Sequence, residues 1–161
     1  MMNSEQFTRL VRRYIDTVFR VALNYLRNAS DAEDITQTVF EKLLREEKPF
    51  ESEDHIRSWL IRVTVNESKD CLKSFFRRNT VSLEELRDYA PELDPDRYRV
   101  LEAVWALPKQ YRDVIYLHYY EGYTAPEIAG LLNRNPNTVY THLHKAKELL
   151  KSALGGDGDG R

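Results

Sequence analysis

The stretch GYTAPEIAGLLNRNPNTVYTHLHKAKELLK, residues 122–151, predicts two short helices joined by a tight turn. Gly122 can adopt the left-handed conformation that ends a preceding helix. Thr124 and Glu127 have the spacing of a capping box, in which each side chain accepts a hydrogen bond from the other residue's backbone amide. Asn135 and Pro136 supply an N-cap and a first helical residue for the second helix. Apolar residues recur three or four positions apart and give each helix one buried face. We expect the buried residues to be Ile128, Leu131 and Leu132, then Val139, Leu143, Ala146, Leu149 and Leu150.

The opposite face of the second helix carries hydrogen-bonding side chains. A polar helix that follows a short helix and a turn fits the major groove of DNA as the second helix of a helix-turn-helix. The alternative is an ordinary helical hairpin whose polar face only contacts water. The candidate DNA-binding residues of this helix are Asn137, Thr138, Tyr140, Thr141, His144, Lys145 and Lys147.

The composition limits the classes of protein that fit. A chain of 161 residues forms one domain or two small ones. No apolar run approaches the ~20 residues of a membrane span, and the first residues lack the apolar stretch of a signal peptide. We therefore expect no membrane insertion. The single cysteine, Cys71, excludes an internal disulfide and is typical of a reducing cytoplasm.

The charge balance argues against a protein that binds DNA unaided. The net charge is −2, and residues 79–98 hold six acidic and two basic side chains. Duplex binding depends largely on the release of cations from phosphates, so a nearly neutral protein binds weakly by itself. We also find no nucleophile–base pair, metal-ligand cluster or phosphate-binding loop in the sequence. These observations favour a non-enzymatic protein without metal or cofactor that another molecule carries to DNA.

The remaining sequence predicts an all-α chain of two small helical domains joined by a flexible acidic linker. In the first domain the hydrophobic spacing predicts one or two helices from Ser4 to about Arg27. It predicts a further helix that begins with a Ser30–Glu33 capping box and ends at about Glu46. A long helix follows from about Glu53 to Phe76. The expected inward residues are Ile35, Val39, Leu43 and Leu44, then Ile56, Trp59, Leu60, Val63 and Leu72. The expected boundaries are 1–78 for the first domain, 79–98 for the linker, 99–154 for the helix-turn-helix domain and 155–161 for a disordered tail.

Two blocks of the sequence resemble one protein family. DAEDITQTVFEKLLR and HIRSWLIRVTVNESKDCLKSFFRR are similar to region two of the bacterial extracytoplasmic-function (ECF) sigma factors. LPKQYRDVIYLHYYEGYTAPEIAGLLNRNPNTVYTHLHKAKELL is similar to region four of the same family. The resemblance covers about residues 5–152, with both blocks in the family's order. It implies a subunit that binds core RNA polymerase, recognises promoter elements, promotes strand opening and directs transcription initiation.

The resemblance assigns residues of the first domain to two surfaces. By analogy, the helix carrying Asp31, Asp34, Gln37, Phe40 and Glu41 binds the polymerase core. Read without the resemblance, the same acids are an ordinary solvated face near a helix start. The resemblance implies that a second surface meets the downstream promoter element, where it would hold an extruded base and the opened strand. Its residues are Phe50, Glu51, Ser52, Arg62, Asn66, Lys69, Lys73, Arg77 and Arg78.

In the second domain the resemblance implies recognition of the upstream promoter duplex. Tyr140, Thr141, His144 and Lys145 would read bases, while Arg112 and Arg134 touch phosphate. Tyr140 and the two histidines of this helix stand where the family often has lysine or arginine, which weakens phosphate binding. The preferred promoter sequence therefore stays open.

The resemblance also implies an anti-sigma protein as a partner, because a flexible linker lets the two domains close around an inhibitor. The low charge fits a factor that meets DNA while held on polymerase, since the second of two linked binding events is intramolecular. Two alternatives remain at this stage. One is a helix-turn-helix transcriptional regulator that never engages core polymerase, and the other is an adaptor that binds only proteins.

Overall fold

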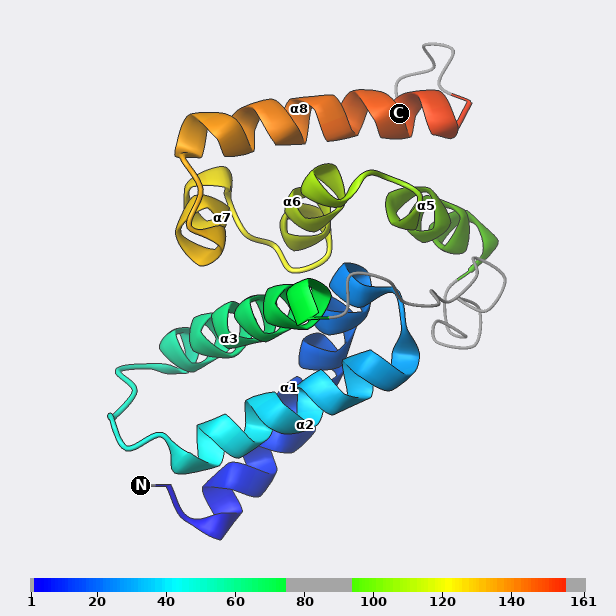
Figure 1. Cartoon of the computed structure of the whole chain (residues 1–161). Helices are drawn as coiled ribbons and strands as arrows, with labels where there is room; N and C mark the ends of the chain where they lie inside the picture. The colour runs from blue at the N-terminus through cyan, green and yellow to red at the C-terminus, as the bar shows by residue number, and fades with distance from the viewer. Residues whose placement is uncertain (1, 75–93, 156–161) are drawn as a thin grey trace. The chain divides into compact units, whose positions relative to one another are not determined.

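The computed structural model describes residues 2–74 and 94–155, in two compact units, Met1–Thr80 and Val81–Arg161, that we treat separately. All regular structure in these described residues is helical, so the predicted all-α fold is confirmed. Figure 1 shows the helices in chain order. The first unit contains α1 (Ser4–Leu26), α2 (Ala29–Arg45) and α3 (Glu53–Ser74); the second contains α5 (Pro95–Trp105), α6 (Lys109–Tyr119), α7 (Ala125–Leu132) and α8 (Pro136–Ala153).

Several sequence-based expectations fall outside the described residues. They are the end of the long helix at Phe76, the site residues Arg77 and Arg78, residues 79–93 of the predicted linker and residues 156–161 of the predicted tail. The last residues assigned to the linker do have a described structure. Asp94 caps α5 by accepting a hydrogen bond from the amide of Arg97 at 2.8 Å, and Tyr98 is buried. The second unit therefore begins before residue 99.

Local capping interactions define the helix ends of the first unit. Asn3 and Gln6 form a capping box that begins α1, and Arg27, in the left-handed conformation, ends it. Asn28 then caps α2, because its side chain accepts a hydrogen bond from the Asp31 amide at 2.9 Å. The predicted capping box at Ser30 is wrong. Asn caps a helix at least as well as Ser, so α2 begins directly after the turn at Arg27, with Asn28 as its N-cap.

The core of the first unit lies between its three helices, and α3 faces it differently from our prediction. Ile56, Trp59, Val63 and Leu72 are only half-buried. The buried side of α3 is instead formed by Leu60, Ile61, Thr64, Val65 and Ser68. The Thr64 hydroxyl donates to the Leu60 carbonyl at 2.6 Å, so this polar group is satisfied inside the core. A hydroxyl bonded in this way is buried without adding to the hydrophobic pattern of the sequence. The pattern therefore predicts a face that is rotated about the helix axis from the face that is buried.

The second unit is built around the predicted helix-turn-helix. Gly122 has a φ of 78°, and the capping box is present, with Thr124 and Glu127 bonded reciprocally at 2.8 and 3.3 Å. Asn135 and Pro136 begin α8 as predicted. The core is formed mainly by Trp105, Val114, Ile115, Leu117, Ile128, Leu131, Leu132, Val139, Leu143 and Ala146. Leu149 and Leu150 are half-buried.

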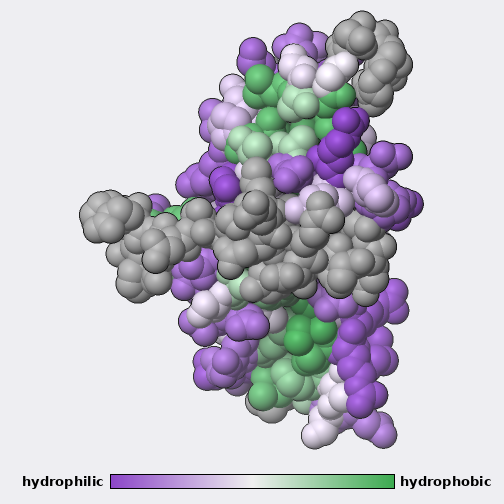
Figure 2. All heavy atoms as spheres, turned by 90° about the vertical axis from the view of Figure 1, so that its right-hand side faces the viewer, coloured by the Kyte–Doolittle hydropathy of each residue, from purple (hydrophilic) through white to green (hydrophobic). Residues whose placement is uncertain are grey.

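Most of the surface that Figure 2 colours by hydropathy is hydrophilic, with two gatherings of hydrophobic side chains on the face shown. Among the described helices, none is both long enough and apolar enough to cross a lipid bilayer. The described residues also contain no group of three or more His, Cys, Asp or Glu side chains arranged to hold a metal ion.

Candidate protein and nucleic-acid interfaces

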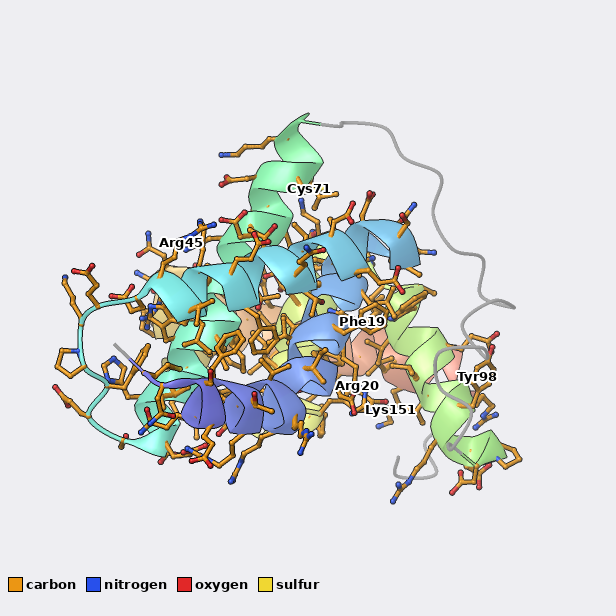
Figure 3. All side chains as sticks on the ribbon, turned by 90° about the horizontal axis from the view of Figure 1, so that it is seen from below. Phe19, Arg20, Arg45, Cys71, Tyr98 and Lys151 are labelled. Carbon is orange, nitrogen blue, oxygen red and sulfur yellow. The ribbon has the colours of Figure 1, made fainter. Side chains whose placement is uncertain are left out.

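One exposed line runs along α2. Asp34, Gln37 and Glu41 lie on the same face at helical spacing, and the Gln37 amide is 3.5 Å from the Glu41 carboxylate. Leu44 continues the line and is 45% exposed. Our prediction that Leu44 faces the core is wrong, because Leu43 beside it already occupies the buried position. Arg45, labelled in Figure 3, projects from the same end of the helix.

Two residues expected on this surface lie elsewhere. Phe40 is 6% exposed and belongs to the core between the helices. Asp31 is 9% exposed in the first turn of α2, where its amide is part of the cap formed by Asn28. The sequence thus identified the exposed line through Asp34, Gln37 and Glu41 and missed Leu44.

The loop between α2 and α3 forms the second candidate surface. Phe50 contacts the rings of His55 and Trp59 edge-on, with centroids 5.1 and 5.6 Å away. The Glu51 amide donates to Nδ1 of His55 at 3.0 Å, and the Ser52 hydroxyl accepts from the His55 amide at 3.1 Å. These bonds fold the loop over the first turn of α3.

The start of α3 is also tied to α1. Glu53 accepts a hydrogen bond from the Tyr14 hydroxyl at 2.9 Å and lies 3.7 Å from both Arg9 and Arg13. Burial, together with the carboxylate of Glu53, raises the pKa of the Tyr14 phenol, so this hydroxyl remains a hydrogen-bond donor at neutral pH. The end of the loop is therefore anchored, because Glu53, the first residue of α3, contacts side chains of α1.

Beyond the loop, one side of α3 combines aromatic, amide and basic groups. Arg62, Asn66 and Lys73 are exposed, and Lys69 is half-buried. Half-buried Trp59 lies on the same side, because positions 59, 62, 66, 69 and 73 follow one face of a helix. This mixture can stack on an unpaired base and contact phosphates at the same time.

The outer face of α8 is the third candidate surface. Its residues are opposite the buried line of Val139, Leu143 and Ala146, and Tyr140 is 55% exposed. The Thr141 hydroxyl donates to the Asn137 carbonyl at 3.0 Å, and Nε2 of His144 lies 3.4 Å from the Glu148 carboxylate. The predicted residues that are exposed on this helix are Asn137, Thr138, Tyr140, Thr141, His144, Lys145 and Lys147.

The two arginines expected to touch phosphate are engaged inside the second unit. Arg112 is 6% exposed and donates to the Leu107 carbonyl at 3.2 Å. Arg134 pairs with buried Asp113, donating to one carboxylate oxygen at 3.1 Å and contacting the other as well. Their charges therefore stabilise the turn and α6, and the exposed lysines of α8 are Lys145, Lys147 and Lys151.

His142 also lies on the inner side of α8. Its ring meets that of Tyr111 edge-on, with centroids 5.5 Å apart. Burial lowers the pKa of His142, the positive charge of Arg134 lowers it further, and Asp113 partly opposes both effects. A neutral His142 is thus part of the packing between α6 and α8 rather than a phosphate contact.

Comparisons with known proteins identify the family. Residues 10–80 match the family described as Sigma-70 region 2, and residues 97–150 match Sigma-70, region 4. RNA polymerase sigma factor SigV of Bacillus subtilis is 30% identical over 139 residues, which cover 84% of this chain and 83% of that protein. ECF RNA polymerase sigma factor SigE of Mycolicibacterium smegmatis is 28% identical, over 90% of this chain and 60% of that protein.

A solved structure shares the fold. The sigma factor RpoE from Bartonella quintana, crystallised with the anti-sigma factor NepR, superposes with a TM-score of 0.74 at 17% identity, over 95% of this chain and 99% of that chain. The present chain belongs to the sigma-70 family of RNA polymerase sigma factors, in its extracytoplasmic-function group. It is a promoter-specific initiation factor for RNA polymerase, and the alternative of a regulator that never engages polymerase is not favoured.

Proposed function

We propose that the three candidate surfaces divide the work of initiation, with α2 binding core polymerase, α3 and its loop binding the opened strand, and α8 binding the upstream duplex. The observation that carries this proposal is the exposed line of Asp34, Gln37, Glu41 and Leu44, on a different compact unit from the helix-turn-helix. A regulator that only bound DNA would have no use for such a line. The chain itself catalyses no reaction in this scheme.

The α2 line has the character of a protein-binding surface. Asp34 and Glu41 provide negative charge, Gln37 provides an amide, and Leu44 exposes an apolar side chain at the end of the line. Charged groups orient a partner and speed its approach, while an apolar side chain that is buried on binding contributes affinity. The partner surface on polymerase should therefore be basic, with an apolar recess at one end.

The loop and α3 suit an unpaired strand. Extruding a base costs a few kcal/mol of stacking, and the aromatic and polar groups around Phe50 and Trp59 can offset part of that cost. Arg62 and Lys73 are exposed on the same helix, and their positive charges suit the backbone phosphates. Asn66 lies between them and offers hydrogen bonds to a base edge.

On α8, weak phosphate binding makes attachment to polymerase necessary. Lys145, Lys147 and Lys151 are the basic residues of the exposed face, and Glu148 opposes them. Few phosphate contacts mean a low affinity for free duplex. When α2 is bound to polymerase, α8 meets the promoter at a high effective concentration, which restores occupancy without new contacts.

We further propose that an anti-sigma protein regulates the chain. RpoE of Bartonella quintana was solved bound to such a protein, NepR, and the exposed lines on α2 and α8 are the surfaces that an inhibitor would cover. Tagged chain isolated from its native host should retain a second, smaller protein that competes with core polymerase. Recovery of polymerase alone, under conditions where the factor is inactive, would count against this regulation.

The division of work is tested by mixing purified chain with purified core polymerase and separating the complexes by size. We expect a one-to-one complex without DNA, and promoter fragments should bind to that complex far more tightly than to the free chain. A chain that binds promoter fragments equally well with and without polymerase would instead support an independent regulator.

A further inference from the structure

His55, a residue outside all three sets of predicted site residues, contacts every residue of the predicted base-holding loop. The Phe50 ring meets the His55 ring edge-on at 5.1 Å. Nδ1 of His55 accepts a hydrogen bond from the Glu51 amide at 3.0 Å, and the His55 amide donates to the Ser52 hydroxyl at 3.1 Å. Phe50, Glu51 and Ser52 thus converge on a single side chain and its backbone.

Other hydrogen bonds of the loop lie nearer α2. The Glu46 amide donates to the Leu43 carbonyl at 3.2 Å, which ends α2, and the Lys48 amide donates to the Glu46 side chain at 3.4 Å. His55 differs from these because it belongs to the first turn of α3, where the Ile56 amide bonds to the Ser52 carbonyl at 3.2 Å. A side chain fixed on a helix can hold a loop more firmly than loop residues hold each other.

A cavity of about 300 Å³ adjoins the same loop. Phe50 and Ile56 form part of its wall, and Gln6, Arg9 and Leu10 of α1 face them. The contacts of Phe50 with His55 and Trp59 hold its ring on one side of this cavity. The position of His55 therefore affects the shape of the space beside the loop.

We propose that His55 is a positioning residue that sets the loop for capture of an unstacked base. The inference rests on the proposed role of this loop in strand opening. Because Nδ1 accepts a hydrogen bond from the Glu51 amide, the tautomer that fits this contact carries its proton on Nε2. A loop held beforehand loses less conformational freedom when the base enters, so more of the binding free energy remains to offset unstacking.

Two substitutions test the hydrogen-bond acceptor and the aromatic ring of His55 separately. His55→Asn places an oxygen at the position of Nδ1 and removes the ring, whereas His55→Phe keeps a ring beside Phe50 and removes the acceptor. His55 is exposed, so both variants should fold, and circular dichroism of the full chain verifies this. Each variant is assembled with core polymerase on a promoter that carries 2-aminopurine in the downstream element, whose fluorescence rises when the base leaves the stack.

We expect His55→Phe to lower the equilibrium constant for promoter opening about fivefold, the effect of losing one hydrogen bond of about 1 kcal/mol. Promoter opening with His55→Asn should remain within about twofold of that with the wild type. Neither variant should change binding of the complex to an upstream duplex. Equal opening by both variants and the wild type would overturn the inference, as would loss with Asn but not with Phe. Absence of any fluorescence change with the wild type would instead refute the proposed function of the loop.

Discussion

The guanidinium group of Arg134 forms a two-point ion pair with the carboxylate of Asp113, joining the turn before α8 to the middle of α6. Asp113 is 2% exposed, and the Arg134 side chain is 20% exposed. Arg134 also donates to the Gln110 carbonyl at 3.4 Å. This pair joins the turn before α8 to α6, and it thereby orients the α8 face that we propose binds DNA.

The first prediction concerns this pair. Arg134→Ala leaves the buried carboxylate without its main positive partner and should lower the free energy of unfolding of the second unit by about 3 kcal/mol. Urea unfolding in a Trp59→Phe background follows this unit alone, because buried Trp105 is then the only tryptophan of the chain. Lys145→Ala is the control for loss of one positive charge and should change stability by less than about 0.5 kcal/mol. A loss below about 1 kcal/mol for Arg134→Ala would contradict the structural role.

The second prediction concerns the α2 line. Asp34→Arg reverses a charge that we propose orients polymerase, and Leu44→Ser removes the apolar side chain at the end of the line. Each should weaken binding to core polymerase at least about tenfold, or about 1.4 kcal/mol. Asp16→Arg, an identical charge reversal at an exposed position of α1, serves as the control and should bind normally. Equal loss in all three variants would indicate a general charge effect rather than a docking surface.

The third prediction concerns the proposed contact of Thr141 with DNA. Its hydroxyl donates to the Asn137 carbonyl, so the methyl group remains free to contact the methyl of a thymine. Thr141→Val keeps the methyl group, so the polymerase complex should retain its affinity for the upstream duplex. Thr141→Ser should lower that affinity about fourfold, the effect of one buried carbon at about 0.8 kcal/mol.

Replacing each thymine of the upstream element in turn by uracil provides the matched test on the DNA side. One such replacement should weaken the wild type and Thr141→Val but leave Thr141→Ser unchanged, as measured by competition binding. If Thr141→Val loses affinity and Thr141→Ser does not, the hydroxyl is the group that contacts DNA.

The fourth prediction concerns pH. Because the pKa of His142 is lowered in the folded chain, the unfolded chain binds more protons between that lowered value and the ordinary value of about 6.5. The free energy of unfolding of the second unit should therefore have its full value above about pH 7 and should decrease as the pH falls through about 6.5. His142→Phe, which can still meet the Tyr111 ring, should remove this part of the pH dependence in the same fluorescence assay. An unchanged pH profile would show that His142 is not the titrating group.

Much of the fold follows from local sequence signals, and the exceptions have physical causes. The helix-turn-helix was predictable because Gly122, the Thr124–Glu127 box and the Asn135–Pro136 start are short-range features that need no tertiary information. The orientation of α3 was not, because Thr64 and Ser68 are buried polar residues whose inward position depends on the neighbouring helices. Similarly, Asn28 replaces Ser30 as the cap of α2 because the preceding turn ends earlier.

The same division holds for the site residues. The exposure of Asp34, Gln37 and Glu41 could be predicted from their regular spacing. That of Arg112 and Arg134 could not, since a basic residue near a turn looks the same whether it binds phosphate or a buried partner. The contacts of His55 could not be predicted for a related reason: they are with loop atoms that no hydrophobic or charge pattern reveals.

The most direct test of the central claim is transcription from a pool of genomic DNA fragments by core polymerase with and without this chain, followed by sequencing of the transcript starts. We predict a small set of new start sites that share one upstream and one downstream element and that disappear with Asp34→Arg. Start sites identical to those of core polymerase alone would contradict the account.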